Sequence, residues 1–109
     1  MKVKAQYDGS RFPPLLKLSI RDAPHRRMHR AMLQKYRECV KLACFKAGMP
    51  IPVSEPIDLE VIFISPTSPD LDNLLTALSQ AMDSKTLKGG GVLSDDSGIS
   101  KVTMFKYYP

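Results

Sequence analysis

The sequence predicts a domain of the α/β (α+β) class, in which two helices pack on one small mixed sheet. Four segments show the polar–apolar alternation or the short apolar runs of strands, and two others repeat apolar residues at helical spacing. Their order along the chain is strand, strand, helix, strand, helix, strand. A length of 109 residues, 43% of them hydrophobic, is enough for one core and not for two. We therefore expect a single domain over residues 1–109.

The first two strands are expected at residues 2–7 and 15–20. Polar and apolar side chains alternate in both segments, as in strands that bury one face. An Asp-Gly turn sequence follows the first segment, and two consecutive prolines precede the second. These features predict a hairpin.

The first helix is expected to begin at Asp22, with Pro24 in its first turn, and to end at Gly48. Apolar residues at helical spacing predict the face that packs on the sheet. These residues are Met28, Met32, Tyr36, Val40, Ala43 and Ala47. The opposite face is basic and carries Arg26, Arg27, Arg30, Lys35, Arg37, Lys41 and Lys46. A solvated surface is one interpretation of this basic face, and contact with a polyanion is the other.

The third strand is expected at residues 57–64, an apolar run that ends before Pro66. Leucines at helical spacing predict the second helix over residues 71–83, and alternation predicts the last strand over 99–108. The Gly-rich segment 85–91 lacks the spacing of a phosphate-binding loop, so it is expected to be a flexible connection.

The charge of the chain is divided between its parts. Residues 1–46 contain 12 basic and 3 acidic residues, whereas residues 47–100 contain 2 basic and 8 acidic ones; the whole chain has a net charge of +5. A basic part attracts a polyanion, for which nucleic acid is the natural candidate, while the acidic part offers carboxylates.

Several classes of protein are excluded by what the sequence lacks. No apolar run approaches 18 residues and no signal peptide is recognisable, so a cytoplasmic protein without a membrane partner is expected. Two cysteines and two histidines fit no zinc-finger spacing. Cys39 and Cys44 are expected to be reduced packing residues.

Two pairs of aspartates flank the second predicted helix. Asp70 and Asp72 follow the third strand, and their side chains would point to one side if the chain were extended there. Asp95 and Asp96 precede the last strand, so we expect the two pairs to meet if the third and last strands are neighbours. Carboxylates with water form a site for Mg²⁺, which could activate a water molecule and stabilise charge on a phosphate.

Each pair also has a simpler interpretation. An aspartate before a helix is a common N-cap, and Ser-Asp-Asp-Ser-Gly is an ordinary turn sequence. Their combination in a basic chain favours a metal site over two separate structural roles. The Asp-x-Asp motif of phosphatases is excluded, because Asp70 does not end the strand itself and the chain is too short for the required parallel sheet.

The aspartate motifs resemble the RusA family of Holliday junction resolvases. The matching segments are Pro69-Asp-Leu-Asp-Asn-Leu-Leu75, Ala77-Leu78 and Val92-Leu-Ser-Asp-Asp-Ser-Gly-Ile99. The resemblance implies a Mg²⁺-dependent endonuclease, with Mn²⁺ as a substitute, that makes paired symmetric nicks in four-way DNA junctions during recombination and repair. It also implies a homodimer encoded by a phage or prophage of a bacterial host.

The same resemblance implies roles for individual residues. Asp70, Asp72 and Asp96 would be the catalytic metal ligands, Asp95 a further ligand beside them, and Asn73 a supporting residue. Independently of the resemblance, the basic residues supply the candidate DNA contacts, which would bind phosphates without reading bases. They are Arg21, Arg26, Arg27, Arg30, Lys85 and Lys88. Tyr107 and Tyr108 could stack on a base, although packing at the end of the last strand is the favoured interpretation.

Two positions depart from the family pattern. Thr76 stands where a lysine is common, and Gln80 stands one helical turn further on, where an acid is usual. These departures support a second hypothesis, a non-catalytic branched-DNA-binding module that has kept the fold. Dimerisation is expected from the chemistry, because symmetric cutting of two strands needs two active sites related by a two-fold axis.

Overall fold

The computed structural model describes residues 1–24, 29–65, 70–84, 90–94 and 98–107. Four strands and two helices lie within these residues. They are β1 (Lys2–Asp8), β2 (Leu15–Arg21), α1 (Arg30–Lys46), β3 (Ile57–Ile64), α2 (Leu71–Met82) and β4 (Ile99–Tyr107). The predicted class, a mixed sheet with two helices packed on it, is confirmed, and so is the expected hairpin between the first two strands.

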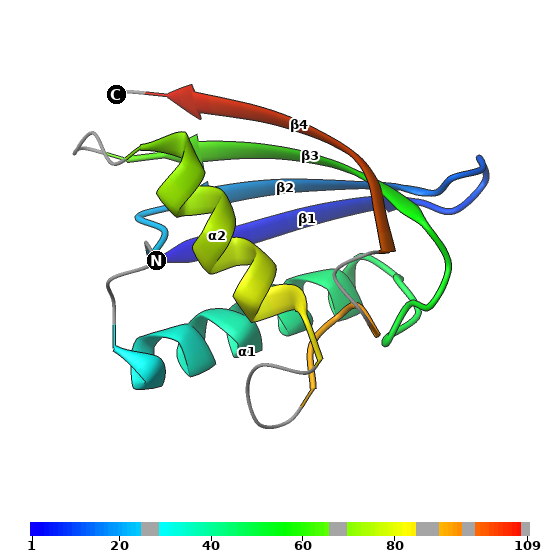
Figure 1. Ribbon diagram of the computed structural model, residues 1–109. Coiled ribbons are helices and arrows are strands. Elements are labelled where there is room, and N and C mark those ends of the chain that lie inside the picture. The colour runs from blue at the N-terminus through cyan, green and yellow to red at the C-terminus, as the bar shows by residue number, and fades with distance from the viewer. Residues whose placement is uncertain (25–28, 66–69, 85–89, 95–97, 108–109) are drawn as a thin grey trace.

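The sheet has the strand order β1-β2-β3-β4. β1 is antiparallel to β2, whereas β2, β3 and β4 are parallel to one another. Each parallel pair needs a crossover, and the two helices supply one each. Figure 1 shows that α1 and α2 both lie on the same face of the sheet, so within the described residues the other face has no helix over it.

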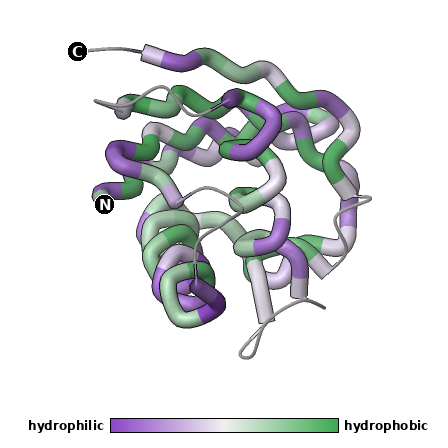
Figure 2. Tube along the Cα trace, turned by 60° about the vertical axis from the view of Figure 1, so that its left-hand side comes forward, coloured by the Kyte–Doolittle hydropathy of each residue, from purple (hydrophilic) through white to green (hydrophobic). Residues whose placement is uncertain are grey.

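The core lies between the helices and the covered face of the sheet. Alternate residues of β2 and β3, such as Leu16, Ile20 and Phe63, are fully buried, and α2 contributes Leu74 and Leu78. Figure 2 shows the corresponding alternation of hydrophobic and hydrophilic residues along the strands. Burial of each such side chain contributes about 1.5–3 kcal/mol. The uncovered face is built from the remaining residues of each strand.

The start of α1 differs from the prediction. Asp22 adopts a left-handed backbone with φ of 56°, and its N–H donates to the carbonyl of Ile64 at 2.9 Å. Residues 22–24 are not helical, and α1 runs from Arg30 with His29 at the N-cap position. The bond to the end of β3 holds the amide of Asp22 beside the sheet, so the chain does not turn into a helix there.

The end of α1 agrees with the prediction. Gly48 has a φ of 86°, which glycine adopts without steric cost. The N–H of Gly48 donates to the carbonyl of Phe45, and the N–H of Met49 donates to that of Cys44. Both bonds together form a Schellman motif, and the buried side chains of Met49 and Cys44 accompany it.

The buried stripe of α1 is rotated from the predicted one. It consists of Leu33, Tyr36, Arg37, Val40 and Cys44. Met32, expected in the core, is 36% exposed, whereas Arg37, expected on the basic surface, is fully buried. Arg37 can lie in this stripe because its guanidinium donates hydrogen bonds to the backbone carbonyls of Gln80 and Ala81 in α2.

The segment after α2 is held close to the helix. Leu93 forms bridges to both Asp83 and Val53, and Gly91 is buried against the end of α2. A Cβ atom on Gly91 would lie 2.0 Å from the carbonyl oxygen of Met82, so only glycine fits there. The expectation of a flexible connection is therefore wrong for Gly91, while residues 85–89 lie outside the described part. No helix among the described residues is long and apolar enough to span a membrane.

Candidate metal site

Asp70 and Asp72 lie at the N-terminal end of α2, and both are exposed. Asp70 has an extended backbone, with φ of −62° and ψ of 141°, and its carbonyl accepts the N–H of Leu74 at 3.1 Å. Its carboxylate, however, makes no capping hydrogen bond. The interpretation of Asp70 as a side-chain cap is therefore not supported.

The geometry of the pair differs from the expected one. Because α2 begins at Leu71, Asp72 lies in its first turn, and the extended alternation that would place both side chains on one side ends at Asp70. The first N–H groups of α2 and the helix dipole give this end a positive potential. Two carboxylates and a phosphate can therefore be accommodated together here, provided that a cation balances their repulsion.

Asp95 and Asp96 lie outside the described residues, but the chain on either side of them is placed. Before them, the N–H of Ser94 donates to the carbonyl of Val53 at 2.9 Å. After them, Gly98 leads into the first residue of β4. Val53 comes shortly before β3 and Gly98 directly before β4, so both flanks lie toward the end of the sheet where these two parallel strands begin.

The structure confirms that β3 and β4 are neighbours, with Ile57 beside Ile99 and Ile64 beside Tyr107. The strands are parallel, however, so the end of β3 and the start of β4 lie at opposite ends of the sheet. α2 returns the chain over this distance and is about 18 Å long. Within one chain, the residues that flank the two aspartate pairs therefore lie toward opposite ends of the sheet, so the expectation that pairing of the third and last strands brings the pairs together is wrong for these flanks.

Among the described residues, no group of three or more His, Cys, Asp or Glu side chains could hold a metal ion. Asp70 and Asp72 thus form an incomplete ligand set within this part of the chain. Asn73, one position further, is partly exposed.

Thr76 bonds within α2 through its side chain, whereas Gln80 contributes its backbone carbonyl to the contact with α1. The hydroxyl of Thr76 donates to the carbonyl of Asp72 at 2.8 Å, a bond within the helix. The carbonyl of Gln80 accepts Nη2 of Arg37 at 3.0 Å. Neither side chain supplies the charge that lysine and an acid would bring to this face.

Arg37 is the residue whose role the sequence prediction missed. Its Nε donates to the carbonyl of Ala81 at 2.9 Å, and its Nη2 donates to the carbonyls of Gln80 and Asp83. A buried cation thus caps the carbonyl end of α2. Burial lowers the pKa of Arg37, and the neighbouring Asp83 opposes that change. Its spacing from Leu33 and Val40, at four and three residues, is the signal that could have placed it in the buried stripe.

The candidate DNA contacts are only partly described. Arg21 is exposed at the end of β2, and Arg30 is exposed at the start of α1. Arg21 pairs with Ile64 at the end of β3, from which the chain leads to Asp70, and the start of α1 lies toward the same end of the sheet, on the left in Figure 1. Arg26, Arg27, Lys85 and Lys88 lie outside the described residues.

In comparisons with known proteins, no family model, no curated protein and no solved structure matches this chain.

Proposed function

We propose that this chain is a Mg²⁺-dependent, structure-specific endodeoxyribonuclease that cuts four-way DNA junctions. The observation that carries the proposal is the pair of exposed carboxylates at the positive end of α2, within an Asp-Leu-Asp-Asn sequence. The carboxylate of Asp70 makes no capping bond, and neither Asp70 nor Asp72 has a salt bridge among the described residues. Carboxylates without a structural partner are available to a cation.

The donor set fits the proposed ion, because Mg²⁺ prefers oxygen ligands and retains several waters. Asp70, Asp72 and Asp96 would hold it, with Asp95 beside them and Asn73 supporting the site. When bound, Mg²⁺ supplies Lewis-acid stabilisation of the phosphate and acidifies a coordinated water. The N–H groups at the start of α2 add favourable potential for the phosphate.

Two copies of the chain are part of the proposal. Symmetric nicks require two active sites, and a two-fold dimer matches the symmetry of the junction. The dimer also offers a way to complete the ligand set. If the Ser94–Gly98 end of one copy meets the start of α2 in the other, Asp96 joins Asp70 and Asp72 across the interface. Each dimer then holds two shared sites.

The test is a matched pair of aspartate variants in a junction-cleavage assay with Mg²⁺. Asp72→Asn should abolish cutting and preserve junction binding, or strengthen it, because a negative charge near the phosphate is removed. Asp22→Asn is the control: Asp22 is also exposed, and asparagine tolerates its left-handed backbone. Cutting by Asp72→Asn at the rate of the control would refute the assignment of the site.

A non-catalytic branched-DNA-binding module is the second candidate. It is favoured by Thr76, whose hydroxyl is used within α2 and brings no positive charge to the site. Such a module would bind junctions and leave them intact with both Mg²⁺ and Mn²⁺.

A further inference from the structure

The uncovered face of the sheet lies apart from the proposed metal site on α2. Strand register aligns its outward side chains in rows across the four strands, because paired residues point to the same face. One row consists of Lys4, Ser19, Ile62 and Phe105. The next row consists of Lys2, Arg21, Ile64 and Tyr107. We call these two rows the basic half-face.

Charge divides this face along the strand direction. The basic half-face contains three basic residues and no acidic one. The two remaining rows contain three acids, Asp8, Asp58 and Glu60, against two lysines. One of these acids, Asp58, forms a salt bridge with Arg11 at 2.7 Å. The positive potential is therefore concentrated on the basic half-face, which is suited to an anionic partner.

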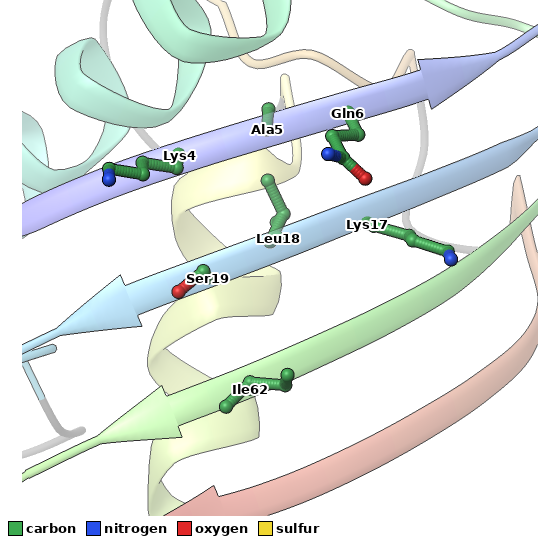
Figure 3. A pocket seen from close by; sticks show the side chains of 7 residues that line it. All are labelled: Lys4, Ala5, Gln6, Lys17, Leu18, Ser19 and Ile62. Carbon is green, nitrogen blue, oxygen red and sulfur yellow. The ribbon is translucent and has the colours of Figure 1, made fainter.

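Large apolar side chains lie exposed beside these cations. Phe105 is 53% exposed, Tyr107 is 60% exposed and Ile62 is 42% exposed. The expectation that Tyr107 packs at the end of its strand is thus wrong, while Tyr108 lies outside the described residues. The two rings are two residues apart on β4, about 6.6 Å along the strand, and point to the same side. Adjoining Ile62 is an open hollow of about 260 Å³ with Lys4, Lys17 and Ser19 on its walls (Figure 3).

We propose that the basic half-face binds single-stranded nucleic acid. Phe105 and Tyr107 stack on unpaired bases, and Lys4 and Arg21 contact the phosphates on the β1–β2 side. A duplex is disfavoured as the ligand, because its bases are stacked on one another and a flat sheet face does not enter its grooves. Single-stranded nucleic acid bound to the basic half-face would lie at the end of the sheet where β3 ends and the chain leads to Asp70.

The first test is fluorescence anisotropy of a labelled 15-nucleotide pyrimidine strand, in EDTA, with a hairpin duplex as the competing ligand. Phe105→Ala should weaken binding of the strand about tenfold, since loss of one stacked ring costs about this much. Phe45→Ala is the matched control, because Phe45 is 73% exposed on α1 and lies away from this face. Equal affinity of Phe105→Ala and Phe45→Ala, or tighter binding of the duplex, would overturn the proposal.

The second test uses the absence of tryptophan from the chain. Phe105→Trp places the only tryptophan of the sequence on the basic half-face, and addition of the pyrimidine oligonucleotide should quench tryptophan emission excited at about 295 nm through stacking. Arg21→Ala should lower the slope of log affinity against log salt by about 0.7, as expected for the loss of one phosphate contact on a single strand. Unchanged emission together with an unchanged salt slope would refute the proposal.

These measurements separate this inference from the proposed function. Binding of the pyrimidine oligonucleotide in EDTA needs neither a metal ion nor cleavage. Binding can therefore be observed even if the protein has no nuclease activity. Sedimentation of Phe105→Ala and the wild type distinguishes a second copy of the chain on this face: a monomer–dimer difference between them, without strand binding, would overturn the proposal.

Discussion

Replacement of Arg37 by methionine should destabilise the fold more than any change on the exposed side of α1. Arg37 joins the middle of α1 to the last turn of α2, where it donates to the carbonyls of Gln80, Ala81 and Asp83. It is fully buried, so water cannot replace these bonds without opening the interface between the helices. Arg37→Met retains much of the side-chain volume and removes every donor.

The size of the effect follows from the groups that are left behind. The variant also removes the cost of burying a guanidinium, which offsets part of the loss. The variant leaves three backbone carbonyls without their hydrogen-bond donor, and each unsatisfied carbonyl costs at least about 1 kcal/mol of folding free energy. The expected loss is therefore about 3 kcal/mol of the free energy of unfolding, a large share of the 5–15 kcal/mol that is typical of a domain.

Urea unfolding followed by circular dichroism measures this difference. Lys35→Met is the matched control, because Lys35 is exposed on the same helix, and it should change the free energy of unfolding by less than about 0.5 kcal/mol. Arg37→Lys should lie between the two, since it keeps the charge and loses the fork of donors. A loss below about 1 kcal/mol for Arg37→Met would refute the role assigned to these hydrogen bonds.

Three further predictions concern other parts of the molecule. The hydroxyl of Tyr36 is buried without a hydrogen-bond partner in the described structure, so Tyr36→Phe should raise the free energy of unfolding by about 1 kcal/mol in urea titrations. Burial raises the pKa of the Cys44 thiol to about 12, whereas Cys39 is partly exposed. At pH 8 a thiol reagent should therefore label Cys39 in the folded protein and Cys44 only in urea, and mass spectrometry can identify the labelled residue. A mixture of inactive Asp72→Asn and Asp96→Asn chains should regain about a quarter of wild-type cleavage if the sites are shared, because half of the dimers then contain one intact site. Absence of any recovery in dimers shown to exchange would contradict shared sites.

The order of the elements, and the extent of all except the first helix, could be predicted from local patterns. The third strand was expected at 57–64 and lies there, and the second helix was expected at 71–83 and ends one residue earlier. These segments have strong periodicity and clear stops, so tertiary contacts reinforce what the local sequence prefers.

The errors arose where tertiary contacts decided the outcome. Asp22 with Pro24 is a good helix start, but the amide of Asp22 bonds to the last residue of β3 instead. Arginine usually lies on the surface, and Arg37 is buried because backbone carbonyls at the end of α2 accept its hydrogen bonds. The sequence around Asp22 and around Arg37 does not show these hydrogen-bond acceptors, because they belong to distant segments of the chain.

The position of Asp70 and Asp72 at the start of a helix was predicted correctly, whereas the spatial relation between the two aspartate pairs was not. Asp70 and Asp72 were expected beside the start of a helix, and they lie there. The meeting of the two aspartate pairs depended on the direction of β4 relative to β3, which the residues of the strands do not encode. Parallel pairing separates the flanks of the two pairs by the length of α2, and this separation leads to the proposal of a site shared between two copies.

Cleavage of a labelled four-way DNA junction is the direct test of the proposed nuclease activity. The purified chain is incubated with the junction, and with linear duplex of the same sequence, in Mg²⁺ and in EDTA. We expect paired, symmetric nicks in the junction alone, and only when Mg²⁺ is present. Tight binding of the junction without nicks, in Mg²⁺ and in Mn²⁺, would contradict the nuclease and leave the DNA-binding module as the function of this chain.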